Sequence, residues 1–117
     1  KIIQRCKKNE MIGYIAAHSV MNSFYILRKA YSEEQRRKML LQYIKIVSVV
    51  GIDKTNILSA LQKEDFTDFE DCLQEKCAII CNAKYIITRN VIDYDKSSVP
   101  AITPETFLKI KEDSDSR

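Results

Sequence analysis

The chain has 117 residues, of which 45% are hydrophobic and 30% are charged, and this length and balance suit one globular domain with one core. Two Gly and two Pro exclude collagen-like, low-complexity and turn-rich all-β architectures, and no apolar run approaches the ~20 residues of a membrane-spanning helix. Residues 1–50 carry ten Lys/Arg against three Asp/Glu (+7), whereas residues 51–117 carry nine against thirteen (−4). The basic half favours contact with a polyanion, and solvated helix faces are the alternative explanation.

The first half of the chain alternates a short apolar segment with helical patterns. The sequence starts in a helical pattern without a Met, and we interpret it as a piece of a longer protein that lacks its N-terminal segment. Residues 14–17 (YIAA) predict a short buried strand, after which Ser19 is expected to cap a helix. Ser32 and Gln35 have the spacing of a capping box and predict the start of a second helix.

The second half continues the same alternation. We expect strands at 47–52, 83–88 and 99–103, and helices that start at Asp53, at about residue 67 and at Pro104. Strands that alternate with helices of this length indicate parallel βαβ units, so the predicted fold class is α/β, a three-layer sandwich with a central parallel sheet. We expect one domain over residues 1–112, followed by a polar C-terminal tail at 113–117.

Four cysteines are present, and three of them lie in one apolar segment: Cys6, Cys72, Cys77 and Cys81. The chain has no C-x-x-C pair, and the single histidine is distant in sequence, which argues against a zinc site. The spacing also does not resemble a disulfide framework. Buried, reduced thiols of a cytoplasmic protein are the prediction.

Three carboxylates of the predicted helix at 67–82 share one face. At 100° per residue, Asp68, Asp71 and Glu75 fall within an arc of about 60°, opposite the apolar residues. Two interpretations stay open: a solvated stripe favoured by the helix dipole, or a site for a cation that compensates the like charges.

Two further segments follow predicted strands, where ligands of parallel sheets bind. Thr88, Asn90 and Asp93 offer hard oxygen ligands of the kind that Mg²⁺ and Mn²⁺ take, although a polar turn is the alternative. Asn22 lies on the first turns of the early helix, where an amide either bonds the local backbone or contacts a ligand.

Together, the stretches AAHSVMNSFYILRK, DFEDCLQEKCA, YIITRNVIDY and VPAITPETFL resemble the bacterial PIN-domain family, in its branch of small toxin-like proteins. The resemblance extends from about residue 14 to residue 108, in the order and spacing of the family. It implies a metal-dependent endoribonuclease with a central parallel sheet, whose acidic cluster binds Mg²⁺ or Mn²⁺ and hydrolyses RNA phosphodiesters. Many relatives are toxins that a cognate antitoxin keeps silent.

Carried over position by position, the resemblance assigns the family acid on the helix before the third strand to Asp71, with Asp68 as a further carboxylate. The acid after that strand falls on Asn90, with Asp93 as its substitute three residues later. The acid on the early helix falls on Asn22. The first acid of the family follows an opening strand that this chain lacks, and in the family this strand lies in the middle of the sheet. We expect either preceding residues or a second chain, as in a strand-exchanging homodimer, to fill that place.

If the chemistry is present, a metal held by Asp71, Asp93 and the missing first acid, with Asp68 nearby, would activate a water. We expect weak occupancy, because the first acid is absent and Asn22 and Asn90 add no charge. Thr88 would fix the loop, Arg89 would contact a phosphate, and basic side chains of the first half would follow the RNA backbone: Arg28, Lys29, Arg36, Arg37 and Lys38.

The alternative is a catalytically weakened PIN-like domain that binds RNA or a protein partner without cleavage. A flavodoxin- or receiver-like module would need an early Asp pair and a late Lys, and the order of motifs does not fit it.

Overall fold

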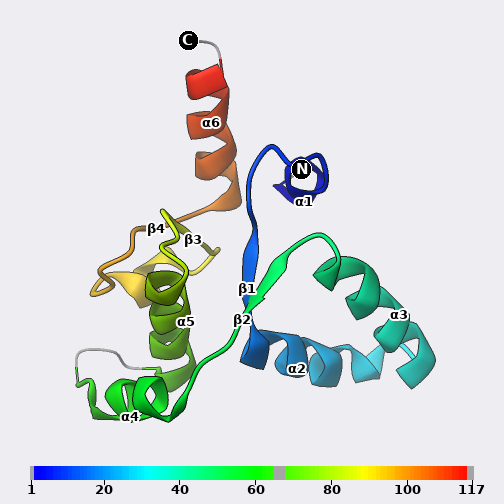
Figure 1. The fold of residues 1–117 in the computed structure, drawn as a ribbon, viewed down its shortest axis with the longest axis horizontal. Coiled ribbons are helices and arrows are strands. Elements are labelled where there is room, and N and C mark those ends of the chain that lie inside the picture. Colours follow the sequence, from blue (N-terminus) through cyan, green and yellow to red (C-terminus); the bar gives the residue numbers. More distant parts are fainter. Residues whose placement is uncertain (1, 65–67, 116–117) are drawn as a thin grey trace. The chain divides into compact units, whose positions relative to one another are not determined.

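Two pairs of short parallel strands, each accompanied by helices, make up the computed structural model of the chain (Figure 1). The structure describes residues 2–64 and 68–115. The chain divides into two units, unit 1 over residues 1–51 and unit 2 over residues 52–117. Within the described ranges, no helix is long and apolar enough to cross a membrane.

Unit 1 is a parallel β-α-β arrangement preceded by a helix. In chain order it contains α1 (Ile2–Lys7), β1 (Tyr14–Ala16), α2 (Ala17–Ile26), the 3₁₀ helix η1 (Leu27–Lys29), α3 (Glu33–Ile44) and β2 (Ser48–Val50). Strands β1 and β2 pair in parallel, with Ile15 opposite Val49. Because parallel neighbours need a crossover connection, α2 and α3 together return the chain to the start of the second strand.

Close packing at the start of β1 requires a glycine. A Cβ on Gly13 would lie 2.8 Å from the Cys6 sulfur and 3.2 Å from a methyl of Val47. Gly13 therefore lets α1 approach the strand pair, and its carbonyl accepts a hydrogen bond of 2.8 Å from the Ser48 N–H. Cys6, Ala16, Val47 and Val50 are the buried apolar residues of this unit.

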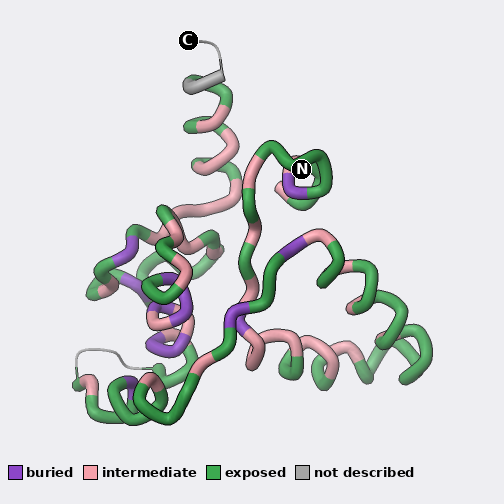
Figure 2. Tube along the Cα trace, in the orientation of Figure 1, coloured by how far each residue is buried: buried purple, intermediate pink, exposed green. Residues whose placement is uncertain are grey.

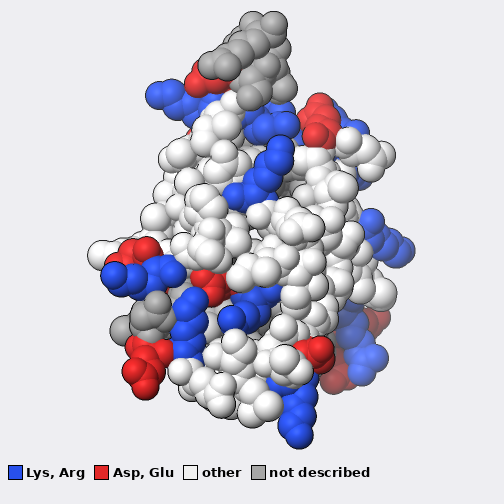
Figure 3. Space-filling model, turned by 60° about the vertical axis from the view of Figure 1, so that its left-hand side comes forward, with Lys and Arg blue, Asp and Glu red and all other residues white. Residues whose placement is uncertain are grey.

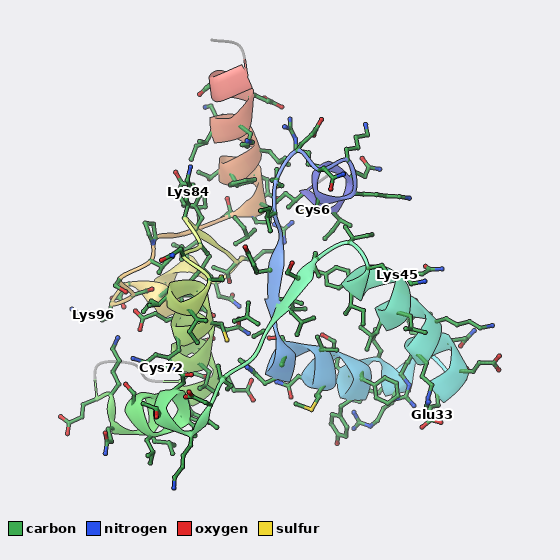
Figure 4. All side chains as sticks on the ribbon, in the orientation of Figure 1. Cys6, Glu33, Lys45, Cys72, Lys84 and Lys96 are labelled. Carbon is green, nitrogen blue, oxygen red and sulfur yellow. The ribbon has the colours of Figure 1, made fainter. Side chains whose placement is uncertain are left out.

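Helices α2 and α3, joined by η1, form a hairpin that we call the α2–α3 hairpin (residues 17–44), and it contains no buried residue (Figure 2). Helix α3 starts with the capping box that the sequence predicts, because the Ser32 side chain accepts from Gln35 N–H and the Gln35 side chain accepts from Ser32 N–H. Glu33 and Lys45 lie at opposite ends of α3, where each complements the helix dipole (Figure 4).

Unit 2 begins with two packed helices, α4 (Lys54–Gln62) and α5 (Phe69–Ile80). It continues with β3 (Ile86–Ile87), the 3₁₀ helix η2 (Val91–Tyr94), β4 (Ala101–Ile102) and α6 (Pro104–Asp115). Strands β3 and β4 pair in parallel. Asp53 caps α4 in a capping box with Asn56, and Asp68 caps α5 by accepting from the Asp71 N–H.

The core of unit 2 lies between α4 and α5, where Ala60, Cys72 and Leu73 form a buried cluster. Beside it, the carboxylate of Glu75 is buried, with 1% of the residue exposed. One oxygen of Glu75 receives a hydrogen bond of 2.7 Å from Lys63 Nζ, and the other receives one of 2.7 Å from the Ser98 backbone N–H. Burial by itself would raise the pKa of Glu75, but these bonds and the Lys63 charge lower it below its usual value.

The α/β class and the parallel pairing agree with the sequence prediction. The described strands form two separate pairs, so the central sheet of a three-layer sandwich stays a prediction. The predicted starts at Ser32, Asp53 and Pro104 are confirmed. The predicted cap at Ser19 is wrong, because α2 follows β1 directly, with Ala16 at its N-cap and no side-chain cap.

The structure also refines several predicted boundaries. The strands are shorter than expected, and the third is reduced to Ile86–Ile87. Residue 67, where the long helix was expected to begin, lies outside the described residues, and α6 continues into the predicted tail as far as Asp115. Three of the four cysteines are buried, as predicted, and all four are free in the structure.

We predict that Glu75→Ala lowers the free energy of unfolding by about 2–4 kcal/mol, because it removes the buried carboxylate that accepts hydrogen bonds from Lys63 and from the Ser98 N–H. Chemical denaturation at pH 7 measures the loss, and Glu70→Ala on the exposed face of α5 is the control, with an expected change of about 0.5 kcal/mol.

The lowered pKa of Glu75 also predicts a pH dependence. Its stabilisation is present above the pKa of an unfolded glutamate, about 4.3, and is lost as the pH falls through the lower pKa of the folded state. A wild-type denaturation midpoint that does not fall relative to that of Glu75→Gln between pH 5 and pH 3 (about one unit either side of that value) would contradict the assignment.

Candidate functional site

Three carboxylates of the predicted site gather around one buried tyrosine in unit 2. Asp68 and Asp71 stand at the start of α5, and Asp93 lies in η2 next to Tyr94. The Tyr94 hydroxyl donates a hydrogen bond of 3.1 Å to Oδ1 of Asp71. This bond attaches η2 to the first turn of α5, so that residues 23 positions apart in sequence share one site.

The electrostatics of the group centre on Asp71. Partial burial raises its pKa, the hydrogen bond from Tyr94 lowers it, and repulsion from Asp68, Asp93 and Glu70 raises it further, with a net upward shift. Burial and the neighbouring Asp71 charge likewise raise the pKa of Tyr94, which keeps its proton as the donor. The site therefore combines negative charges whose mutual repulsion a bound cation would relieve.

The ligand set is small for a resident metal. Among residues 2–64 and 68–115, no group of three His, Cys, Asp or Glu side chains is arranged to hold a metal ion. Glu75, the third member of the predicted stripe, is bound to Lys63 and Ser98. Mg²⁺ often takes only one or two carboxylates and fills its other positions with water and substrate phosphate. The described carboxylates of unit 2 therefore do not by themselves form a closed metal site.

The remaining predicted residues of unit 2 lie in the loop between β3 and η2. Thr88 Oγ1 accepts a hydrogen bond of 3.0 Å from the Asn90 N–H, which shapes the turn into η2. Asn90 is exposed at the N-cap of η2 and makes no side-chain cap bond. The guanidinium of Arg89 forms an exposed ion pair of 2.8 Å with Glu105. Such a pair contributes little stability, so Arg89 can exchange Glu105 for a phosphate.

The other predicted residues belong to unit 1. Asn22 is exposed on α2 and stays a predicted member of the site. The predicted RNA contacts lie in the α2–α3 hairpin, where Arg37 pairs with Glu33 at 3.7 Å and Lys38 pairs with Glu34 at 3.4 Å. Acidic and basic side chains also occur close together at several places on the face shown in Figure 3.

Tyr94 is a member of the site that the sequence did not predict. Its ring is buried and its hydroxyl donates a hydrogen bond to Asp71, whereas the prediction for this segment names the polar groups of Asn90 and Asp93. The available signal is an aromatic hydroxyl directly after Asp93, and only the fold shows that this hydroxyl reaches α5. For Glu75 the sequence allows either a cation ligand or a solvated residue. In the structure Glu75 is neither, because it is buried and forms an ion pair with Lys63.

We predict opposite shifts in the pKa of Asp71 from two substitutions. Tyr94→Phe removes the donor that favours the charged carboxylate and should raise the pKa, whereas Asp93→Asn removes a like charge and should lower it. Carboxyl carbon shifts measured by NMR across a pH titration report both. Shifts of the same sign in the two variants would contradict the arrangement around Tyr94.

One comparison with known proteins gives a match at the level of a family. A family model described as "PIN domain" matches residues 1–92, which include α5, Asn90 and the beginning of η2. No curated protein and no solved structure matches the chain. PIN domains are generally nucleases that use divalent metal ions. Because the match covers most of the sequence, the chain belongs to the PIN-domain family.

Proposed function

We propose that the chain is a PIN-type endoribonuclease that hydrolyses RNA phosphodiesters with Asp71 and Asp93 as its central carboxylates. The observation that carries the proposal is the electrostatic state of Asp71, which is partly buried and lies within range of the like charges of Asp68 and Asp93. Gathering these charges is unfavourable in the free protein, and a cation brought by a phosphodiester compensates them.

Each residue of the predicted site has a defined part in this proposal. Asp71 and Asp93 would hold Mg²⁺ or Mn²⁺, with Asp68 beside them, and Asn90 and Asn22 would orient water or bind through their carbonyls. Tyr94 keeps one oxygen of Asp71 in place through its hydroxyl. When bound, the ion supplies an acidified water and neutralises charge on the phosphate oxygens.

Substrate binding is assigned to basic side chains. Thr88 supports the loop that carries Arg89, and Arg89 would contact a phosphate of the scissile region. The hairpin residues Arg28, Lys29, Arg36, Arg37 and Lys38 would follow the RNA backbone. Contacts of this type release counterions and make binding depend on salt.

RNA or protein binding without cleavage is the second candidate, and two observations favour it. Asn22 and Asn90 stand where the resemblance places acids, and the described residues contain no three-ligand metal group. The first proposal extends to a toxin of a toxin–antitoxin pair, located in the cytoplasm, with an antitoxin or a second copy of the chain as partner.

We predict that the protein cleaves a structured RNA in the presence of Mn²⁺ or Mg²⁺, that EDTA stops the reaction, and that Asp71→Asn or Asp93→Asn lowers the rate by ~100-fold or more. Electrophoresis of end-labelled RNA measures the rate. Asp53→Asn is the matched control, since it also removes one carboxylate, but from an N-cap that asparagine serves equally well.

The same material separates the two candidates. RNA binding that persists without any metal-dependent cleavage would exclude the nuclease and leave the binding module. Cleavage that survives in both Asp71→Asn and Asp93→Asn would place the active site elsewhere.

A further inference from the structure

An exposed tyrosine on α2 is fixed against an arginine. Tyr25 has 61% of its surface exposed, and the guanidinium carbon of Arg28 lies 3.6 Å from the centre of its ring. Arg28 Nη1 also donates a hydrogen bond of 2.8 Å to the Tyr25 carbonyl. The two bonds hold the guanidinium plane on one face of the ring, and a guanidinium can cover only that face.

A second pair of the same kind stands beside the first in sequence. The guanidinium carbon of Arg36, from α3, lies 4.3 Å from the centre of the Phe24 ring, and its Nη1 donates a 2.9 Å hydrogen bond to the Phe24 carbonyl. These contacts bind α3 to α2 in a hairpin that has no buried residue. The hairpin therefore holds two aromatic rings, each with an arginine against it, and Tyr25 is the exposed one of the two.

The charge of the hairpin identifies the ligand class. Residues 17–44 carry five Lys/Arg and two Asp/Glu, a net charge of +3, and the two acids are already paired at the surface of α3. A polyanion with planar rings matches this surface in both respects, since bases stack on aromatic and guanidinium planes while the cations contact the backbone. In a duplex the bases are stacked on one another, so the match is to a single strand.

We propose that the α2–α3 hairpin binds single-stranded RNA by stacking a base on Tyr25, with Arg28 fixing the ring and the other cations of the hairpin contacting phosphates. This inference rests on the proposed function, and it adds a base-binding residue to it. Tyr25 acts through its ring face, and its hydroxyl is not required.

The test measures the affinity of the full chain for a fluorescein-labelled oligouridine by anisotropy, in EDTA so that no cleavage occurs. Tyr25→Ala should weaken binding by about 5- to 150-fold, the range expected for loss of one stacked base, and Tyr25→Phe should bind like the wild type. Tyr31→Ala is the matched control, because Tyr31 is an exposed tyrosine of the same hairpin (41%). Circular dichroism confirms that each variant is folded.

The salt dependence separates stacking from charge. Loss of a phosphate contact, as in Lys38→Ala, should reduce the slope of log K against log salt by ~0.7, whereas Tyr25→Ala should leave the slope unchanged. The loss in Tyr25→Ala should also be absent for the same oligouridine paired with oligoadenine.

Three results would overturn the inference: equal weakening by Tyr25→Ala and Tyr31→Ala, unchanged affinity in folded Tyr25→Ala, or a wild-type dimer that Tyr25→Ala converts to monomers, since Tyr25 would then lie in a protein interface. A wild-type protein that binds neither single-stranded nor duplex RNA at low salt would instead refute the proposed function, and the inference with it.

Discussion

Two carboxylates one turn apart on α5 hold the segment of residues 94–98 against that helix. Asp71 accepts from the Tyr94 hydroxyl and Glu75 accepts from the Ser98 N–H. Both bonds join groups 23 positions apart, and the second is accepted by a buried carboxylate whose other oxygen accepts from Lys63. A buried carboxylate without such partners would be strongly unfavourable, so this pairing determines where η2 lies, and with it the position of Asp93.

Asp71 therefore has a structural role and also experiences repulsion from nearby carboxylates. It anchors η2 through one oxygen, and it lies near three other acids that raise its pKa. An isolated structural aspartate would be more stable without those neighbours, which is why the group suggests a function beyond anchoring. The amides at Asn22 and Asn90 carry no charge, so the predicted site has fewer negative charges than one with acids at those two positions.

Unit 1 has only a small buried core, and its α2–α3 hairpin is held together by other contacts. Its strand pair buries Ala16, Val47 and Val50, but the α2–α3 hairpin lies outside that small core. Arginine–aromatic stacking and an arginine–carbonyl bond connect the two helices at Phe24 and Arg36, where a larger domain would use aliphatic side chains. A hairpin held in this way keeps most of its cations and the rings of Tyr25 and Tyr31 at the surface, where a polyanion can reach them.

The local features of the molecule were predictable from the sequence alone: the caps at Ser32 and Asp53, the parallel α/β class, and Asp71 and Glu75 one turn apart on one helix. Each depends on residues three or four positions apart or on the alternation of elements. The cap at Ser19 failed because β1 runs directly into α2, which no side-chain pattern indicates. The partners of Asp71 and Glu75 could not be predicted in this way, because Tyr94 and Ser98 lie 23 positions away in sequence. Only the tertiary structure could place Tyr94 on one acid and Lys63 on another, because periodicity identifies the face of a helix and carries no information about its distant partner.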